Sequence, residues 1–355
     1  MVKNIKYNNR KDVVYRKNYL RQKLLTSPKN IFNSMPKMIG PQFQGEWALY
    51  SCSMFAQALA NIAIIYPETK EENIETINEL ITNVLSEELK KYDAKQWNNE
   101  DPIDSLEYGE EIKHLSYRSH LAWMICNYKI IGGDDRYDNL LNSLCSAMAA
   151  GIKKSPSMLL PTYIDMAVYL PDMMVALVAL NYYNKLSNGK YKSLVDSWIY
   201  KAKTEWVDEK TGLLSSYISY EGLTSTTIRG SYSALNTYYL ALIDKAFAEK
   251  QYQILKKTFV IKRLLTGCRE YPYNTNKFVT LDVDAGPIIL DISPSGTAFL
   301  IGCATIFGDY KLRKRLLTTA NIAGCTFTFN KKRHYLLSNL APVGEAIVLA
   351  MKTSI

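Results

Sequence analysis

The stretch that decides the fold reads YRSHLAWMICNYKII at 117–131, GGDD at 132–135 and RYDNLLNSLCSAMAAGI at 136–152. The first part is apolar or small on nearly every side, whereas the third carries an apolar stripe beside a polar face. A helix that is apolar all round must be buried, and an amphipathic helix lies at a surface. Because the Gly-Gly-Asp-Asp segment is typical of a turn, the stretch predicts a hairpin of one inner and one outer helix.

The same pattern recurs along the chain. Apolar helices are predicted at 46–66, 171–186, 230–243 and 285–307, each followed by an amphipathic helix, at 71–92, 191–206, 247–265 and 311–323. A last apolar helix at 342–351 has no amphipathic helix after it, and the basic segment 12–25 is a candidate for its outer partner. Six inner helices inside a collar of outer ones form an all-α, (α/α)6 toroid.

An open solenoid is the competing architecture. It needs polar caps at both ends, and the apolar helix at 342–351 is not a polar cap. The closed ring is therefore favoured. Short β-hairpins are expected at one mouth of the ring, near 278–283 and 326–329.

The positive charge is confined to the start of the chain. The net charge is +9, but residues 1–40 hold ten of the 43 Lys and Arg and one of the 34 acidic residues, so the remainder carries 33 of each. We divide the chain into a basic N-terminal arm, 1–40, and a single barrel domain, 41–355. A neutral barrel does not favour a nucleic-acid partner. Contact of the arm with anionic lipid is the less favoured alternative to its packing against the ring.

The remaining motifs indicate no cofactor and no metal. The six cysteines are scattered without a CxxC pair, which favours a reducing compartment, the cytoplasm. The start lacks the apolar stretch of a secretory signal, and no uninterrupted apolar run reaches membrane-spanning length. The run 134–138 matches the DDxxD pattern of diphosphate-binding enzymes, but it opens an outer helix, where Asp is a preferred cap. Nucleotide-binding and GxSxG motifs are missing from the sequence.

Polar and aromatic residues recur where the inner helices begin, which is the chemical signal of the sequence. In a ring of hairpins these starting ends meet at one mouth, so we expect them to line a single pocket for a small-molecule substrate. The candidate residues are Glu46, Trp47, Tyr50, Tyr117, His120, Tyr163, Asp165, Tyr169, Asp172, Arg229, Tyr232, Arg269 and Asp284.

Several of these residues have two possible roles each. His120 is suited to proton exchange near neutral pH or to a hydrogen-bonded place in the core. Asp172 follows Pro171, so it either complements the start of a helix or, if desolvated in the pocket, acts as proton donor or base. Arg229 precedes Gly-Ser at a helix start, where it holds an anion or pairs with an acid. Asp282 and Asp284 favour a capping role over a hard cation.

These motifs, in their order, resemble the linalool dehydratase/isomerase-like family. The resemblance rests on 45–47, 117–121, 163–172, 229–231 and 282–287. It implies an (α/α)6 barrel, a homo-oligomer, and cofactor-independent acid–base chemistry on a terpenoid-like alcohol or alkene. His120 matches the family's pocket histidine and Tyr232 a pocket tyrosine. The family's two pocket cysteines fall on Tyr163 and Asp172, which puts linalool itself in doubt and would make these residues another proton-transfer pair.

Three functions follow. The first is a lyase or isomerase in which Asp172, Tyr163 and His120 pass protons. The second, by analogy of fold, is a carbohydrate-active enzyme (a glycoside hydrolase, lyase or epimerase) with Asp172 paired with Asp284 or Glu46. The third is a non-catalytic binding or assembly protein. A closed apolar cavity would favour the first, and a long, open, polar groove the second.

Overall fold

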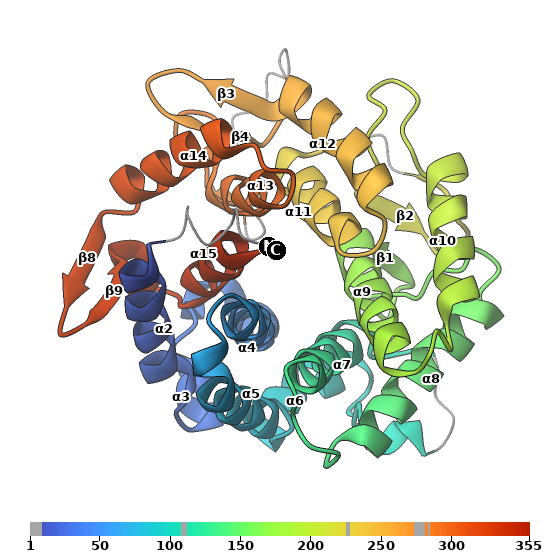
Figure 1. Cartoon of the computed structure of the whole chain (residues 1–355). Coiled ribbons are helices and arrows are strands. Elements are labelled where there is room, and N and C mark those ends of the chain that lie inside the picture. Colours follow the sequence, from blue (N-terminus) through green and yellow to red (C-terminus); the bar gives the residue numbers. More distant parts are fainter. Residues whose placement is uncertain (1–8, 108–111, 225–227, 273–280, 283–284) are drawn as a thin grey trace.

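The computed structural model describes residues 9–107, 112–224, 228–272, 281–282 and 285–355. In this part of the chain, six helical hairpins close into a ring (Figure 1). The inner helices are α4 (Gly40–Ile65), α7 (Leu115–Ile130), α9 (Leu170–Leu186), α11 (Gly230–Ala241), α13 (Pro294–Ile306) and α15 (Val343–Thr353). The outer layer holds α5 (Lys70–Val84), α6 (Glu87–Gln96), α8 (Asp138–Lys154), α10 (Lys192–Glu205), α12 (Lys245–Phe259), α14 (Tyr310–Ala323) and α2 (Arg10–Leu24). The predicted (α/α)6 class is confirmed.

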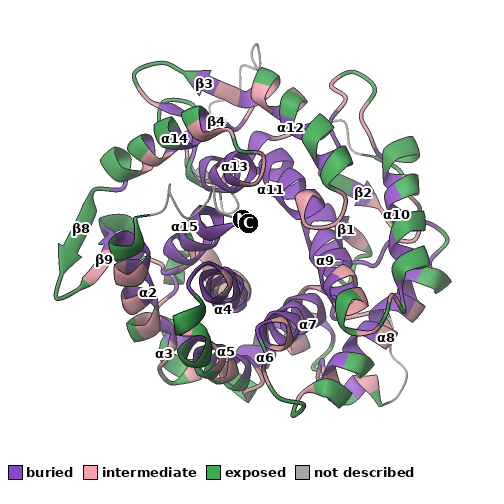
Figure 2. Cartoon of the chain, viewed as in Figure 1, coloured by how far each residue is buried: buried purple, intermediate pink, exposed green. Residues whose placement is uncertain are grey.

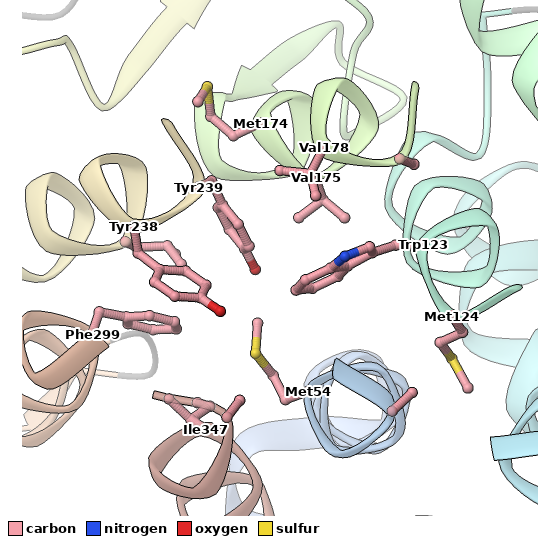
Figure 3. Close-up of a cluster of buried hydrophobic side chains, with 14 of the residues drawn as sticks. Met54, Trp123, Met124, Met174, Val175, Val178, Tyr238, Tyr239, Phe299 and Ile347 are labelled. Atoms are coloured by element: carbon pink, nitrogen blue, oxygen red, sulfur yellow. The ribbon is translucent and has the colours of Figure 1, made fainter. Parts of the chain in front are cut away.

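Burial divides the two layers as the apolar pattern predicts. The inner helices are buried nearly all round, whereas the outer helices are buried on one side and exposed on the other (Figure 2). Side chains from the inner helices meet in the middle of the ring, among them Met54, Trp123, Tyr239 and Phe299 (Figure 3). The middle is therefore a packed core, and any sizeable cavity must lie toward an end of the ring.

The N-terminal helix α2 lies against α15, in the place of the sixth outer helix (Figure 1). Val13, Leu20 and Leu24 of α2 are fully buried. Arg16 forms an ion pair with Glu345 of α15, and neither side chain is exposed. Part of the positive charge of the basic arm is thus buried in an ion pair between α2 and α15, the last inner helix.

Short antiparallel strands connect the hairpins. β1 (Ala167–Tyr169) pairs with β2 (Tyr217–Ser219), and β5 (Leu281–Asp282) with β6 (Gly286–Pro287). β4 (Thr266–Arg269) lies between β3 (Val260–Lys262) and β7 (Ile292–Ser293). β8 (Thr326–Phe329) and β9 (Lys332–Tyr335) form the predicted hairpin near 326–329, which lies in the outer layer between α14 and α2 (Figure 1). Of the hairpin expected at 278–283, residues 278–280 and 283 lie outside the described residues.

The remaining elements are α3 (Pro28–Asn33) and four 3-10 turns, η1 (Lys37–Ile39), η2 (Pro67–Thr69), η3 (Asp104–Leu106) and η4 (Leu336–Asn339). Three helix predictions need correction. The helix expected at 247–265 ends at Phe259, because Val260–Lys262 form β3. The helix expected at 71–92 is divided into α5 and α6, because Ser86 adopts an extended conformation between them. The helix expected at 285–307 begins only at Pro294, because the residues before it form β6 and β7.

The expectation that no apolar run reaches membrane-spanning length also needs correction, because of helix α4. The segment Lys37–Ile65 is long and apolar enough to cross a membrane by composition alone. In the ring, however, 89% of its most apolar window is buried by the other helices. Its apolar character is accounted for by its inner position.

Candidate functional site

A cavity of about 660 Å³ lies at the end of the ring where the inner helices begin. All six inner helices contribute to its wall near their N-terminal ends, for example through Glu46, Ser116, Asp172, Ser231 and Val343. The shared direction of the inner helices brings these residues together, although they are far apart in the sequence. Side chains of the packed middle of the ring, such as Met54, Trp123 and Tyr239, come from positions farther along the same helices (Figure 3).

Among the described residues, two carboxyl side chains line this cavity. Glu46 of α4 accepts a hydrogen bond of 2.8 Å from Nε2 of Gln42, and Asp172 of α9 is 7% exposed. Both lie near the buried Tyr92: its pKa is raised well above the usual value by burial first, then by the charges of Asp93, Glu46 and Asp172. The structure thus places Glu46 and Asp172 on the wall of one cavity. Asp284, the other carboxylate considered with Asp172, lies outside the described residues.

His120 of α7 also lines the cavity. Its Nδ1 shares a hydrogen bond of 2.7 Å with Oγ of Ser53, and its Nε2 has no hydrogen-bond partner among the described residues. The ring of Tyr50 lies beside it, with 4.8 Å between ring centroids. Burial lowers the pKa of His120 to about 3. The ring is therefore neutral near pH 7, which argues against the expected proton exchange and for a hydrogen-bonding role.

A cluster of aromatic rings forms another part of the cavity wall, and we call the part of the cavity lined by these rings, Glu46 and Asp172 the aromatic chamber. Tyr169, Tyr217 and Tyr232 pack together with centroid distances of 5.3–5.5 Å, and the hydroxyls of Tyr217 and Tyr232 are 3.2 Å apart. Tyr169 and Tyr217 are directly opposite each other in the β1–β2 pair. Trp47, Tyr50 and Tyr163, which were predicted, line the cavity as well. Tyr217 was not predicted, because nothing local in the sequence indicates that 217 pairs with 169.

Arg229 is held by the protein itself. Its guanidinium pairs with the carboxylate of Glu270, lies 4.4 Å from the ring centroid of Tyr232, and donates a 2.8 Å hydrogen bond to that tyrosine's hydroxyl. Glu270 also accepts hydrogen bonds from the Ser231 hydroxyl, at 2.9 Å, and from the Ser231 backbone N–H, at 3.3 Å. Burial raises the pKa of Glu270 despite these partners. The anion at the start of α11 is therefore Glu270, which supports the pairing interpretation of Arg229.

Three other predicted substrate-binding residues lie away from the cavity wall. Tyr117 is fully buried and donates a hydrogen bond of 2.7 Å to the backbone oxygen of Val84, so it faces the outer layer. Asp165 is exposed and accepts a hydrogen bond from the backbone N–H of Ala167, which gives it a turn-forming role. Arg269 is buried, with Nη2 3.7 Å from the Asp291 carboxylate.

The acidic run at 134–138 lies on the outside of the ring. Asp134 pairs with the exposed Arg136 at 2.6 Å and accepts a hydrogen bond from the Tyr128 hydroxyl at 3.0 Å. Within the described ranges, no group of three or more His, Cys, Asp or Glu side chains is placed to hold a metal ion.

Comparison with known proteins identifies the class of fold. No family model matches the chain, and no curated protein matches it in sequence. Among solved structures, a barrel described as an unsaturated glucuronyl hydrolase specific for heparin matches with a TM-score of 0.61 and 12% identity, covering 99% of this chain and 95% of its own. The GH76A alpha-1,6-mannanase from Salegentibacter sp. matches with a TM-score of 0.58 and 12% identity, covering 96% and 98%.

A family 105 glycoside hydrolase from C. acetobutylicum is a third match, with a TM-score of 0.53 and 12% identity, over 86% of this chain and 92% of that one. At this identity the likeness shows the shared fold. It supports the fold implied by the resemblance to the linalool dehydratase/isomerase-like family. Membership of that family stays a prediction.

Proposed function

We propose that this protein is a carbohydrate-active enzyme of the (α/α)6 class, with Glu46 and Asp172 as its acid–base pair. One observation carries the proposal: two carboxyl side chains and a wall of aromatic rings line the same cavity. Trp and Tyr faces suit the apolar faces of sugar rings, and paired carboxyls are the usual means of breaking a glycosidic bond. The names of the three structures similar in fold add support, since they describe a glucuronyl hydrolase specific for heparin, a mannanase and a glycoside hydrolase.

The reaction would divide between the two carboxyls. One donates its proton to the glycosidic oxygen as the bond to the anomeric carbon breaks. The other either takes a proton from the attacking water or itself attacks that carbon, and in the second case water, deprotonated by the first carboxyl, then hydrolyses the glycosyl-enzyme. Trp47 and the tyrosine cluster would hold the sugar rings. Nε2 of the neutral His120 would form a hydrogen bond with a sugar hydroxyl, while Nδ1 keeps its hydrogen bond with the Ser53 hydroxyl.

The test is turnover of a panel of glycans, neutral and uronate-containing, by the native protein and three variants. We expect Asp172→Asn and Glu46→Gln each to lower kcat by about 10²- to 10⁴-fold, because each removes one proton-transfer group. Asp165→Asn is the matched control. Asp165 is an exposed carboxylate on the other side of strand β1 from Asp172 in the sequence, and it does not line the cavity. Native rates in both cavity variants would exclude this pair.

A terpenoid lyase or isomerase is the second candidate, and the aliphatic side chains of the cavity wall favour it. Tyr163 and Asp172, the predicted proton-transfer pair, line the cavity together with many aliphatic side chains. The products separate the two functions: a glycosidase releases a reducing sugar, whereas the lyase adds or removes water at a double bond. Binding of a ligand without turnover of either substrate class would favour the non-catalytic alternative.

A further inference from the structure

The cavity extends beyond the aromatic chamber into a second part, which we call the apolar arm. It is lined by Ala298 and Ile301 of α13, Ala320 of α14, Val343 and Ile347 of α15, and Leu337 of η4. The chamber and the arm form one continuous cavity. A molecule in the chamber can therefore extend into the arm.

The arm lies beside the part of the outer layer where a β-hairpin takes the place of a helix (Figure 1). Helix α14 packs on α13 and α2 packs on α15, but the outer layer between α14 and α2 is made by the β8–β9 hairpin (Figure 1). Two large apolar side chains that line the cavity and follow β9 in the chain remain exposed: Leu337 is 51% and Leu340 68% exposed. Clustered exposed apolar residues beside a cavity mark a binding surface.

Two hydroxyl groups along the arm already form hydrogen bonds within the protein. The Thr319 hydroxyl accepts a 2.9 Å hydrogen bond from the backbone N–H of Thr266, and the Ser338 hydroxyl donates a 3.1 Å bond to the Glu345 carboxylate. A second sugar placed here would lose hydrogen bonds to water and gain few in return, which is unfavourable. An aliphatic chain makes no hydrogen bonds to water, so it loses none when it enters the arm.

We infer that the apolar arm binds the aliphatic part of an amphiphilic glycoside whose sugar occupies the aromatic chamber. The sugar half of this inference rests on the proposed function, whereas the aliphatic half rests on the arm alone. The substrate class is then a glycoside of a long-chain alcohol or lipid rather than a soluble polysaccharide.

The experiment measures binding of two probe series by calorimetry below their aggregation concentrations: the n-alkanols from butanol to octanol, and methyl and octyl β-D-glucopyranoside. We expect affinity in the alkanol series to rise about fourfold for each methylene buried in the arm. Octyl glucoside should bind more tightly than methyl glucoside by a comparable factor per methylene. An affinity independent of chain length in both series would overturn the inference.

Two variants locate the bound chain. Ala320→Phe fills the arm from α14 and should abolish the dependence on chain length while leaving methyl glucoside binding unchanged, which also reports that the variant is folded. Ala150→Phe is the matched control, because Ala150 is a partly buried alanine of the outer helix α8 that does not line the cavity. Leu340→Asp, at an exposed position, places a charge at the mouth of the arm and should weaken octanol binding without affecting folding. Unchanged octanol binding in both arm variants would also overturn the inference.

The two proposals fail separately in this design. If alkanols bind in the arm but the glucosides gain nothing over the matching alkanols, and no glycan is turned over, the arm stands and the carbohydrate function falls. If glycans are turned over with loss in Asp172→Asn but chain length has no effect, the function stands and the arm is refuted.

Discussion

Protonation of His120 offers a sharp test of the site. Burial lowers the pKa of this histidine from 6.5 to about 3 in the folded protein. Below pH 6.5 the unfolded chain therefore binds a proton that the folded protein does not, and the free energy of unfolding falls as the pH decreases from about 6.5 toward 3. Between pH 7 and pH 5 this linkage amounts to about 2 kcal/mol, because the unfolded histidine becomes almost fully protonated over this interval.

The measurement is urea unfolding of the native protein and of His120→Gln at both pH values. Other groups titrate over the same interval, but they do so in both proteins, so the difference between the two pH dependences isolates His120. We expect the native protein to lose about 2 kcal/mol more than the variant on going from pH 7 to pH 5. The result at pH 5 hardly depends on the folded pKa as long as it lies near or below 4.

Equal losses in the two proteins would refute the reasoning. They would mean that the folded state takes up a proton at His120 as readily as the unfolded chain, through solvent entry or an acidic neighbour. The neutral hydrogen-bonding role would then be wrong, and His120 would again be a candidate for proton transfer near neutral pH.

Two further predictions concern the scaffold of the site. Glu345→Gln should lower the free energy of unfolding by about 3 kcal/mol in urea titration, because it leaves the guanidinium of Arg16 buried without its main partner; a loss below about 1 kcal/mol would show that the pair is not needed to hold α2 to α15. Gly230→Ala should cost about 3 kcal/mol or more, since the added Cβ would lie 1.9 Å from the backbone oxygen of Arg269. Gly344→Ala, whose Cβ would meet no atom within 4 Å, is its control, and equal stability of the two variants would contradict the predicted clash.

The ring was predictable because each hairpin repeats one contrast between an apolar and an amphipathic helix. The unpartnered apolar helix at 342–351 even indicated where 12–25 should lie, and α2 is found against α15. The failures have a local cause. The apolar pattern of 71–92 continues across the Ser86 break, and a short apolar strand such as those within 285–293 has the same composition as a buried helix.

The site was predictable to the extent that it follows from topology. Inner helices that run in one direction must begin at one mouth, and this places Glu46 and Asp172 together. The direction of a single side chain does not follow from topology. Tyr117 and His120 are three residues apart and differ by about 60° around the helix, enough for His120 to face the cavity and Tyr117 to face α5. Tyr217 depended on a strand pair that joins residues 48 positions apart.

The same topology explains how this chamber accommodates its acidic side chains. Six helices point their N-terminal ends, each with a partial positive charge and unpaired backbone N–H groups, toward one volume. At the start of α11, the Glu270 carboxylate accepts a hydrogen bond from the backbone N–H of Ser231. At the start of α13, the hydroxyl of Ser293 accepts a hydrogen bond of 3.0 Å from the backbone N–H of Gly296. Asp172 is an acidic residue in the first turn of α9, where the same partial positive charge favours a carboxylate. The field that stabilises a carboxylate in the first turn would also stabilise negative charge that develops on a substrate bound at this mouth, if the proposed acid–base function holds.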